Sequence, residues 1–340
     1  KVHEAKWLPL PFLPKDATET RALYPPSTAA TLNLAAVTAQ CARLWRDLDA
    51  EFADRCLHVA ISAYDAALKN PEVYAYNNFD GGGAYGDLDV ADEFAWASHE
   101  LFATTRLEKY RSGLSETPAS TWQQRLHDQS LRDVFWADVD LLPLLTTLTV
   151  MDPFSDQELA TAEAIIRKMA DRYLDDLARD GYRAPMPVNG YAWGSNGAIA
   201  ARSLVLGMAH DLTQNASYLD ANIAILDYLL GRNPLGQSYI AGFGTNPVKF
   251  VHHRFWAAGA DPSYPIAPPG ALSGGPNAGY PVDPINEKAE LDNCFPQTCW
   301  ADDYTAFSLN EVAINWNSAL FWLAAYLDTT PTHKIHSAEK

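Results

Sequence analysis

Residues 300–318 read WADDYTAFSLNEVAINWNS, and the interpretation of the whole chain starts from this stretch. It places one carboxylic acid, Glu311, at the start of an aromatic and apolar helix that the pattern predicts over residues 310–327. Phe307 and two tryptophans of the stretch are near enough in sequence to exclude water from this acid, and burial raises the pKa of a carboxyl group. A carboxyl group that keeps its proton near neutral pH can act as a general acid.

The order of residues in this stretch is also unusual. An aromatic residue is followed by Asp302, then by a second aromatic residue, then by Glu311 and finally by an Asn-Ser pair. This string is similar, at every constrained position, to a signature of glycoside hydrolase family 9, the cellulase family. Residues 238–254 read SYIAGFGTNPVKFVHHR and resemble the other signature of that family, with a departure at Ala241, where a β-branched residue or Ser is expected.

The resemblance implies roles for individual residues. Glu311 would be the general acid, and we predict that Asp302 is catalytic as well. A competing interpretation is that Glu311 only occupies the first turn of the last helix, where the helix dipole favours an acid. Six further residues in the signatures and nearby motifs are predicted to contact a sugar, although core packing is the alternative for the tryptophans. The predicted sugar contacts are His252, Arg254, Trp193, Trp300, Tyr304 and Trp316.

Inverting hydrolysis of a glycosidic bond needs two carboxyl groups, an acid and a base, roughly 6.5–9.5 Å apart. Members of the family carry the base in an Asp-Ala-Gly-Asp motif near the N-terminus, and no such motif occurs in this sequence. We therefore expect a companion polypeptide that carries the N-terminal barrel helices and the Asp base.

Apolar periodicity predicts helices in most of the chain and no convincing strand. The expected helices cover residues 29–45, 52–68, 92–104, 139–150, 155–177, 195–212, 216–230 and 310–327. The resemblance implies an all-α fold, the (α/α)6 barrel, with residues 1–340 forming one catalytic domain that holds about eight or nine of the twelve helices. The Gly- and Pro-rich residues 231–300 are predicted to form a functional loop.

The charge of the chain limits the classes of molecule that it can bind. The chain of 340 residues carries a formal net charge of −17, which argues against nucleic acid and anionic membranes as partners. A soluble, secreted enzyme without an organic cofactor is expected. Cys294 and Cys299 are predicted to close a small ring in an oxidising compartment, whereas Cys41 and Cys56 fall within helical patterns and are predicted to be buried thiols.

A calcium site is a further expectation, because acids cluster where a loop meets a helix and calcium prefers hard oxygen ligands. The cluster resembles a calcium loop of the family, in which an Asp-Glu pair joins an Asp that follows a Trp. Acids at a helix N-terminus also occur without a metal. The predicted ligands are Asp87, Asp89, Asp92, Glu93 and Asp138.

The leading hypothesis is an inverting hydrolase of β-1,4-glycosidic bonds in cellulose, cello-oligosaccharides or related β-glucans. One alternative is an exo-acting β-glucosidase or β-glucosaminidase, in which Asp302 and Asp303 would supply an acidic subsite for a sugar amine. Another alternative is a catalytically inactive carbohydrate-binding protein that lacks the base. The sequence leaves open endo or exo action, appended modules and the oligomeric state.

Overall fold

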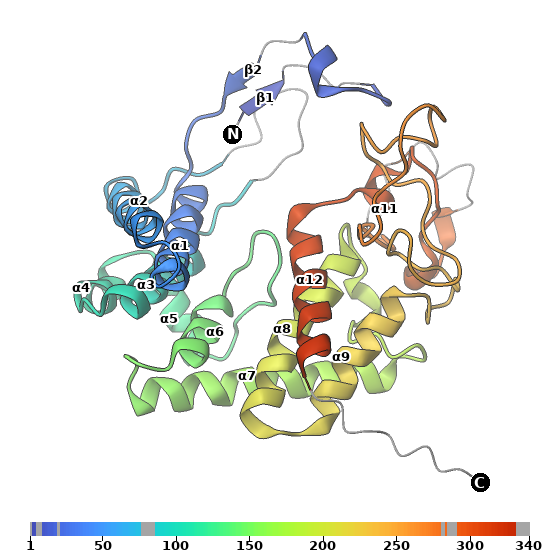
Figure 1. The fold of residues 1–340 in the computed structure, drawn as a ribbon. Helices are drawn as coiled ribbons and strands as arrows, with labels where there is room; N and C mark the ends of the chain where they lie inside the picture. The colour runs from blue at the N-terminus through green and yellow to red at the C-terminus, as the bar shows by residue number, and fades with distance from the viewer. Residues whose placement is uncertain are drawn as a thin grey trace. The chain divides into compact units, whose positions relative to one another are not determined.

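The computed structural model describes residues 2–4, 9–18, 21–75, 86–279, 283 and 291–330. The chain divides into two compact units (Figure 1). The first unit consists of Lys1–Leu8 and Thr18–Ile166, and the second consists of Pro9–Ala17 and Arg167–Lys340. Their boundary falls within a single long helix, α7 (Asp156–Arg179), and the expectation of one catalytic domain over residues 1–340 stays a prediction.

The first unit is built on helices that pack around an alanine-rich face of α1. Four α1 residues, Leu32, Ala35, Ala36 and Ala39, are completely buried, and their small side chains let α1 lie close to both α2 and α3. The helices of this unit are α1 (Thr28–Trp45), α2 (Ala50–Lys69), α3 (Ala91–Thr105), α4 (Lys109–Ser112), α5 (Ala119–His127) and α6 (Leu142–Val150), with a 3-10 turn at Gly113–Glu116.

Two short strands, β1 (Val2–Glu4) and β2 (Arg21–Leu23), pair antiparallel in this unit, with Val2 opposite Leu23. The sequence predicted no strand, and three residues are too few to show the alternation of a half-buried strand.

A disulfide bond between Cys41 and Cys56 joins α1 to α2, with their Cα atoms 6.0 Å apart. The prediction of two buried thiols was therefore wrong. Each cysteine does lie in a helix, as expected, but the two helices form an antiparallel hairpin that brings the side chains together. Helical periodicity predicts each helix separately and gives no information on which cysteines of two different helices lie close together.

The second unit places α8 (Ser195–Thr213) between α9 (Ala216–Leu229) and α12 (Ile314–Thr329). Glycines on α8 allow α12 to approach closely. A Cβ atom on Gly197 would lie 2.2 Å from Cδ1 of Trp316, and one on Gly207 would lie 2.4 Å from Cη2 of Trp322. A short helix, α11 (Phe307–Asn310), precedes α12. Isolated 3-10 turns lie at Pro14–Asp16, Val188–Gly190, Leu291–Asn293 and Pro296–Thr298.

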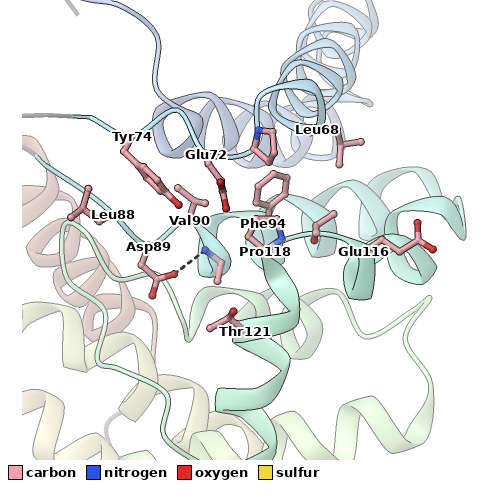
Figure 2. Close-up of a pocket in the computed structure, with 13 residues that line it drawn as sticks. Leu68, Glu72, Tyr74, Leu88, Asp89, Val90, Phe94, Glu116, Pro118 and Thr121 are labelled. Carbon is pink, nitrogen blue, oxygen red and sulfur yellow. Dashed lines mark hydrogen bonds between the residues drawn. The ribbon is translucent and has the colours of Figure 1, made fainter.

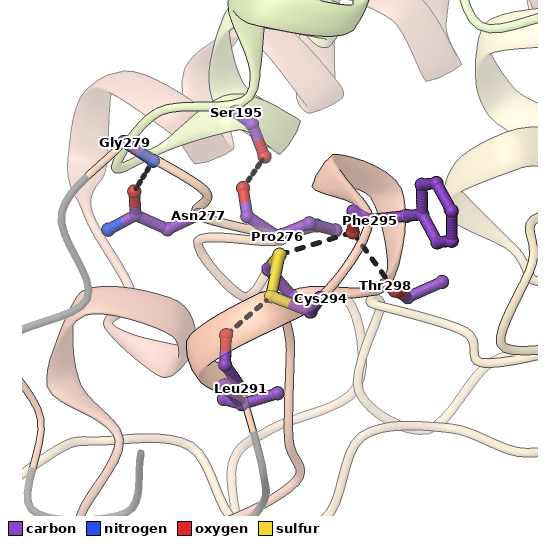
Figure 3. The surroundings of a disulfide bond; sticks show 9 residues. Ser195, Pro276, Asn277, Gly279, Leu291, Cys294, Phe295 and Thr298 are labelled. Carbon is purple, nitrogen blue, oxygen red and sulfur yellow. Dashed lines mark hydrogen bonds between the residues drawn. A yellow bond between two sulfur atoms is a disulfide. The ribbon is translucent and has the colours of Figure 1, made fainter.

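Within residues 231–279 and 291–300, the structure contains no helix longer than three residues, in agreement with the predicted long loop. The loop is tied by backbone pairs, including Ile240 with Leu272 and His252 with Glu311. The predicted disulfide between Cys294 and Cys299 is present, with the Cα atoms 5.2 Å apart, and Figure 3 shows the short turn that it closes.

Seven of the eight expected helices agree with the structure to within three residues at each end. The last does not, because α12 begins at Ile314 and not at residue 310, and Glu311 lies between α12 and the short preceding helix α11. The sequence also missed α5, where Ala119 and Trp122 are the buried residues and too few to give a clear period. None of the described helices has the combination of length and apolar character needed to cross a bilayer.

The contact between α8 and α12 gives a first prediction. Gly197→Ala places a methyl group against the buried ring of Trp316, and overpacking of this kind costs roughly 1–3 kcal/mol of unfolding free energy. Chemical denaturation should show the loss. Gly181→Ala is the control, because a Cβ atom there meets nothing within 4 Å. Equal denaturation midpoints for the two variants would contradict the packing described.

Candidate active site

The backbone of Glu311 is fixed by neighbours on two loops. Glu311 follows the last residue of α11 and adopts an extended conformation, with φ −56° and ψ 151°. Its carbonyl accepts the N–H of Gly274 at 2.9 Å, and the adjacent carbonyl of Asn310 accepts the N–H of His252 at 2.9 Å. Glu311 is thus outside the first turn of α12, so the interpretation that it serves only as an acid favoured by that helix dipole does not hold.

The side chain of Glu311 is half-buried beside Trp193, whose indole Nε1–H donates to Oε2 at 3.1 Å. Burial raises the pKa of the Glu311 carboxyl group, the Trp193 hydrogen bond lowers it, the negative charge of Asp283 raises it, and the positive charge of Arg254 lowers it. The net direction is upward. Glu311 therefore keeps its proton to a higher pH than an exposed glutamate does.

His252 presents one defined ring nitrogen. Its Nδ1 lies 2.8 Å from the carbonyl oxygen of Tyr304, and because a carbonyl only accepts, Nδ1 carries the hydrogen. Burial lowers the pKa of His252, and the nearby charge of Arg254 lowers it further. In the neutral ring that results, Nε2 has a lone pair and can accept a hydrogen bond from a hydroxyl group.

Arg254 brings positive charge to the same segment. Its carbonyl oxygen accepts the N–H of Phe12 at 2.9 Å, which anchors residues 9–17 to the site loop. Its Nε–H is buried and has no hydrogen-bond partner among the residues that the structure describes. A buried donor without a partner favours an incoming acceptor, such as a sugar hydroxyl.

Asp302 holds the loop that leads to His252. Its carboxylate accepts the backbone N–H groups of Lys249 and Phe250, the latter at 2.8 Å. Burial raises the pKa of Asp302, and these hydrogen bonds oppose that shift. The neighbouring Asp303 accepts the N–H and the hydroxyl of Thr305. Both carboxylates are thus engaged within the loops of the site.

The aromatic residues predicted to contact a sugar differ in exposure. Trp193 is 38% exposed and its ring lies 5.7 Å from that of Phe307, whereas Trp300 and Trp316 are each only 7% exposed. The ring of Trp316 fills a space bounded by three glycines, Gly194, Gly197 and Gly274. Tyr304 is half-buried and contributes its carbonyl to His252. This burial favours the packing interpretation for Trp300 and Trp316.

Sequence reasoning missed Asp283, a buried carboxylate whose charge acts on both Glu311 and His252. It lies in the loop after a Pro-Val pair, outside both signatures, and no spacing in the sequence connects it with Glu311.

The predicted calcium ligands lie in the first unit and are accompanied by arginines that the sequence analysis did not consider. Arg132 pairs with Asp138 at 2.6 Å and with Asp89 at 3.2 Å, and Arg125 pairs with Asp89 at 2.8 Å and with Asp140 at 2.7 Å. Across the described part of the chain, no group of three or more His, Cys, Asp or Glu is arranged as a metal site.

Two acids of this cluster each have one buried oxygen without a hydrogen bond to any described residue, although the other oxygen of Asp92 accepts the N–H of Val139 at 2.7 Å. Asp92 Oδ1 and Glu93 Oε2 are buried without a hydrogen-bond partner in the described residues. Burial raises the pKa of Asp92 to about 6, and burial together with the charges of Asp92 and Asp87 raises the pKa of Glu93 to about 10. Asp92 Oδ1 lies 3.3 Å from Nη2 of Arg132, and Asp89 and Asp138 also face guanidinium groups, whereas no ion pair to Glu93 is found among the described residues. Calcium binding stays a prediction.

The first unit also has a pocket of about 470 Å³ near the ends of α2 and α3 (Figure 2). Glu72, Tyr74, Phe94 and Thr121 line it, together with Asp89 from the predicted calcium ligands. Glu311 and its neighbours belong to the other unit and take no part in this pocket.

Comparison with known proteins identifies the family to which the site belongs. The sequence model of glycosyl hydrolase family 9 matches residues 2–324. The chain belongs to this family. Over 96% of its length it is 39% identical to a cellulose 1,4-beta-cellobiosidase of Acetivibrio thermocellus and 40% identical to endoglucanase C of Cellulomonas fimi. It covers 39% and 30% of the lengths of these two relatives.

Solved structures of the family have the same fold. The chain matches a mutant (D468A) of a thermostable endoglucanase from Alicyclobacillus acidocaldarius with a TM-score of 0.84 and 30% identity, covering 97% of this chain and 60% of that one. A metagenome-derived family 9 endoglucanase matches with a TM-score of 0.84 and 27% identity, and 57% of it is covered. The predicted all-α fold class, the (α/α)6 barrel, is confirmed.

The hydrogen bond from Trp193 gives a prediction about the charge of Glu311. Trp193→Phe removes a donor that stabilises the ionised carboxylate, so the pKa of Glu311 should rise. Infrared difference spectroscopy of the carboxyl band, with Glu311→Gln used for assignment, measures that pKa directly. Trp45→Phe, on the exposed side of α1, is the control. An unchanged or lowered pKa in Trp193→Phe would disprove the described electrostatics.

Proposed function

We propose that the protein hydrolyses β-1,4-glycosidic bonds in cellulose, cello-oligosaccharides or related β-glucans with inversion, and that Glu311 is the general acid. The observation that carries this proposal is the half-buried Glu311 carboxyl group, which has a raised pKa and lies next to the segment with His252 and Arg254. The names of the relatives, an endoglucanase and a cellobiosidase, support the same substrate class.

In inverting hydrolysis, the residues of this chain would carry out one of the two proton transfers, the one to the leaving oxygen. The protonated Glu311 gives its hydrogen to the glycosidic oxygen as the bond from that oxygen to the anomeric carbon breaks. A water molecule adds to the anomeric carbon from the opposite face and loses its proton to a carboxylate base. The Nε2 atom of His252 accepts a hydroxyl hydrogen of the sugar and the Nε–H of Arg254 donates to a sugar oxygen. Asp302 acts through the backbone that it holds.

We propose that the base and the remaining barrel helices lie on a companion segment or polypeptide. Support comes from α1, which exposes apolar side chains at helical spacing, with Leu44 near its end 64% exposed. A stripe of this kind usually packs against another helix. The stripe consists of Leu34, Val37 and Leu44, and Leu48, in the turn after the helix, is also exposed. A chain that covers 60% of a solved relative is consistent with further helices on another segment.

Exo action is a second candidate, favoured by the similarity to a protein named cellobiosidase. The β-glucosaminidase alternative has less support, because the carboxylate of Asp302 already accepts the N–H of Phe250 and that of Asp303 accepts the hydroxyl hydrogen of Thr305. An inactive carbohydrate-binding protein is the outcome if no base is present. Secretion is part of the proposal and is supported by the two disulfides, since these bonds persist in oxidising compartments.

The assignment of the acid is tested with Glu311→Gln in the full-length protein. Loss of a general acid should lower kcat on cellohexaose by roughly 10²–10⁴-fold. A substrate with a good leaving group, such as an activated aryl cellobioside, needs little protonation and should lose much less. Glu51→Gln, a surface residue whose side chain is 88% exposed, is the matched control. Full activity of Glu311→Gln on cellohexaose would exclude the assignment.

Calcium binding is a separate proposal with its own test. Calcium held by Asp92 and Glu93 would raise the unfolding free energy by about 2.7 kcal/mol at a concentration 100 times its dissociation constant. Calorimetric unfolding with and without calcium measures this difference. Glu93→Gln should unfold at the same temperature in both conditions. If the wild-type protein gains nothing from calcium, the arginine pairs alone neutralise the cluster.

A further inference from the structure

Asp283 makes two hydrogen bonds to a single residue next to the site. It is 6% exposed, and its Oδ1 accepts the backbone N–H of Ser308 at 2.9 Å, while its Oδ2 accepts the hydroxyl hydrogen of the same serine. Ser308 is completely buried. A buried carboxylate directed with both oxygens at one residue is a specific arrangement, and neither family signature includes Asp283.

The contact between Asp283 and Ser308 supplies a hydrogen-bond acceptor that the N-terminus of α11 lacks. This helix has only four residues, and its N-cap residue, Ala306, has no side-chain oxygen to accept an N–H group of the first turn. Isolated single turns are not stable, because nucleation of a helix is unfavourable. Asp283 provides the acceptor and the negative charge that an N-terminal turn favours, from a position 25 residues earlier in the sequence.

The site depends on α11 because the helix begins and ends with site residues. Phe307, its first residue, lies 5.7 Å from the Trp193 ring and 5.8 Å from the His252 ring, and Glu311 follows its last residue. A shift of Ser308 would move Phe307 and Glu311 together.

We propose that Asp283 is a positioning residue, which holds α11 through Ser308 and thereby fixes the carboxyl group of Glu311 relative to Trp193 and His252. This inference rests on the proposed function of Glu311.

The charge of Asp283 has a second, separable effect. The groups that face Glu311 are the indole N–H of Trp193, the guanidinium of Arg254 and the carboxylate of Asp283. Of these, Asp283 alone raises the pKa of Glu311, because two negative charges close together are unfavourable. It also raises the pKa of His252, against the stronger lowering by burial.

Two variants of the full-length protein separate positioning from charge. Ser308→Ala removes the hydroxyl bond and keeps the charge of Asp283. Because a hydrogen bond contributes modestly, kcat should fall roughly three- to tenfold with KM unchanged, and the alkaline limb of the pH profile should stay in place. Ser308→Thr, which restores a hydroxyl, should recover most of the loss.

Asp283→Asn keeps the shape of the side chain and one acceptor oxygen but removes the charge. Its alkaline limb in kcat/KM should move to lower pH, because the carboxyl group of Glu311 loses a neighbour that favours its protonated form. If Asp283→Asn leaves the limb in place and Ser308→Ala leaves kcat unchanged, the proposal is wrong.

A measurement that does not depend on activity distinguishes failure of this inference from failure of the acid assignment. Hydrogen–deuterium exchange at the amides of residues 308–311 should accelerate in Ser308→Ala, and Ser318→Ala, which alters a hydroxyl bond on the exposed side of α12, is the control. If exchange is faster in Ser308→Ala but Glu311→Gln keeps full activity, the positioning role of Asp283 stands and only the assignment of Glu311 as the general acid is wrong. Unchanged exchange would overturn the positioning role whatever Glu311 does.

Discussion

The site depends on how the backbone at Asn310 and Glu311 is held. The carbonyl groups of these two residues accept N–H groups from His252 and Gly274, which belong to different parts of the long loop. These two bonds bring residues that are far apart in sequence into one arrangement. The neighbouring helix α11 ends at this point, so Glu311 is extended and its side chain leaves the helix toward Trp193.

The same arrangement explains the electrostatics of the site. Glu311 is half-buried, so its ionised form is disfavoured, and the positive and negative neighbours adjust the size of that effect. His252 is neutral for a related reason, because burial and Arg254 both disfavour its protonated form. A carboxyl group whose pKa is raised, beside an imidazole whose pKa is lowered, suits the transfer of a proton to an oxygen atom and the binding of hydroxyl groups.

Much of the fold could be predicted from the sequence, because most helices are long and strongly periodic. Ser27 caps α1, and Ser155 and Glu158 form a capping box at the start of α7. The later start of α12, at Ile314, could not be predicted, because the apolar pattern already begins at residue 310, whereas the carbonyls of Asn310 and Glu311 accept hydrogen bonds from a distant loop. The disulfide from Cys41 to Cys56 was missed for a similar reason, since it depends on how two helices face each other.

The candidate site, like the fold, was predicted from the sequence only in part. The signatures bring together Glu311, His252, Arg254 and Asp302, and these residues are neighbours in the structure through bonds to the backbone. Asp283 and the arginines beside the acidic cluster lie outside any motif, because their importance comes from burial and charge that the chain acquires only on folding. Trp316 matches a motif, yet its ring is enclosed by Gly194, Gly197 and Gly274.

The most direct test of the account is a crystal structure of the full-length protein carrying Glu311→Gln with a bound cello-oligosaccharide. If Glu311 is the general acid, the side chain at position 311 lies within about 2.6–3.2 Å of a glycosidic oxygen. An aspartate carboxylate from the companion segment is then expected on the opposite face of the sugar, roughly 6.5–9.5 Å from that side chain. A bound oligosaccharide whose glycosidic oxygen is out of reach of position 311 would contradict the account.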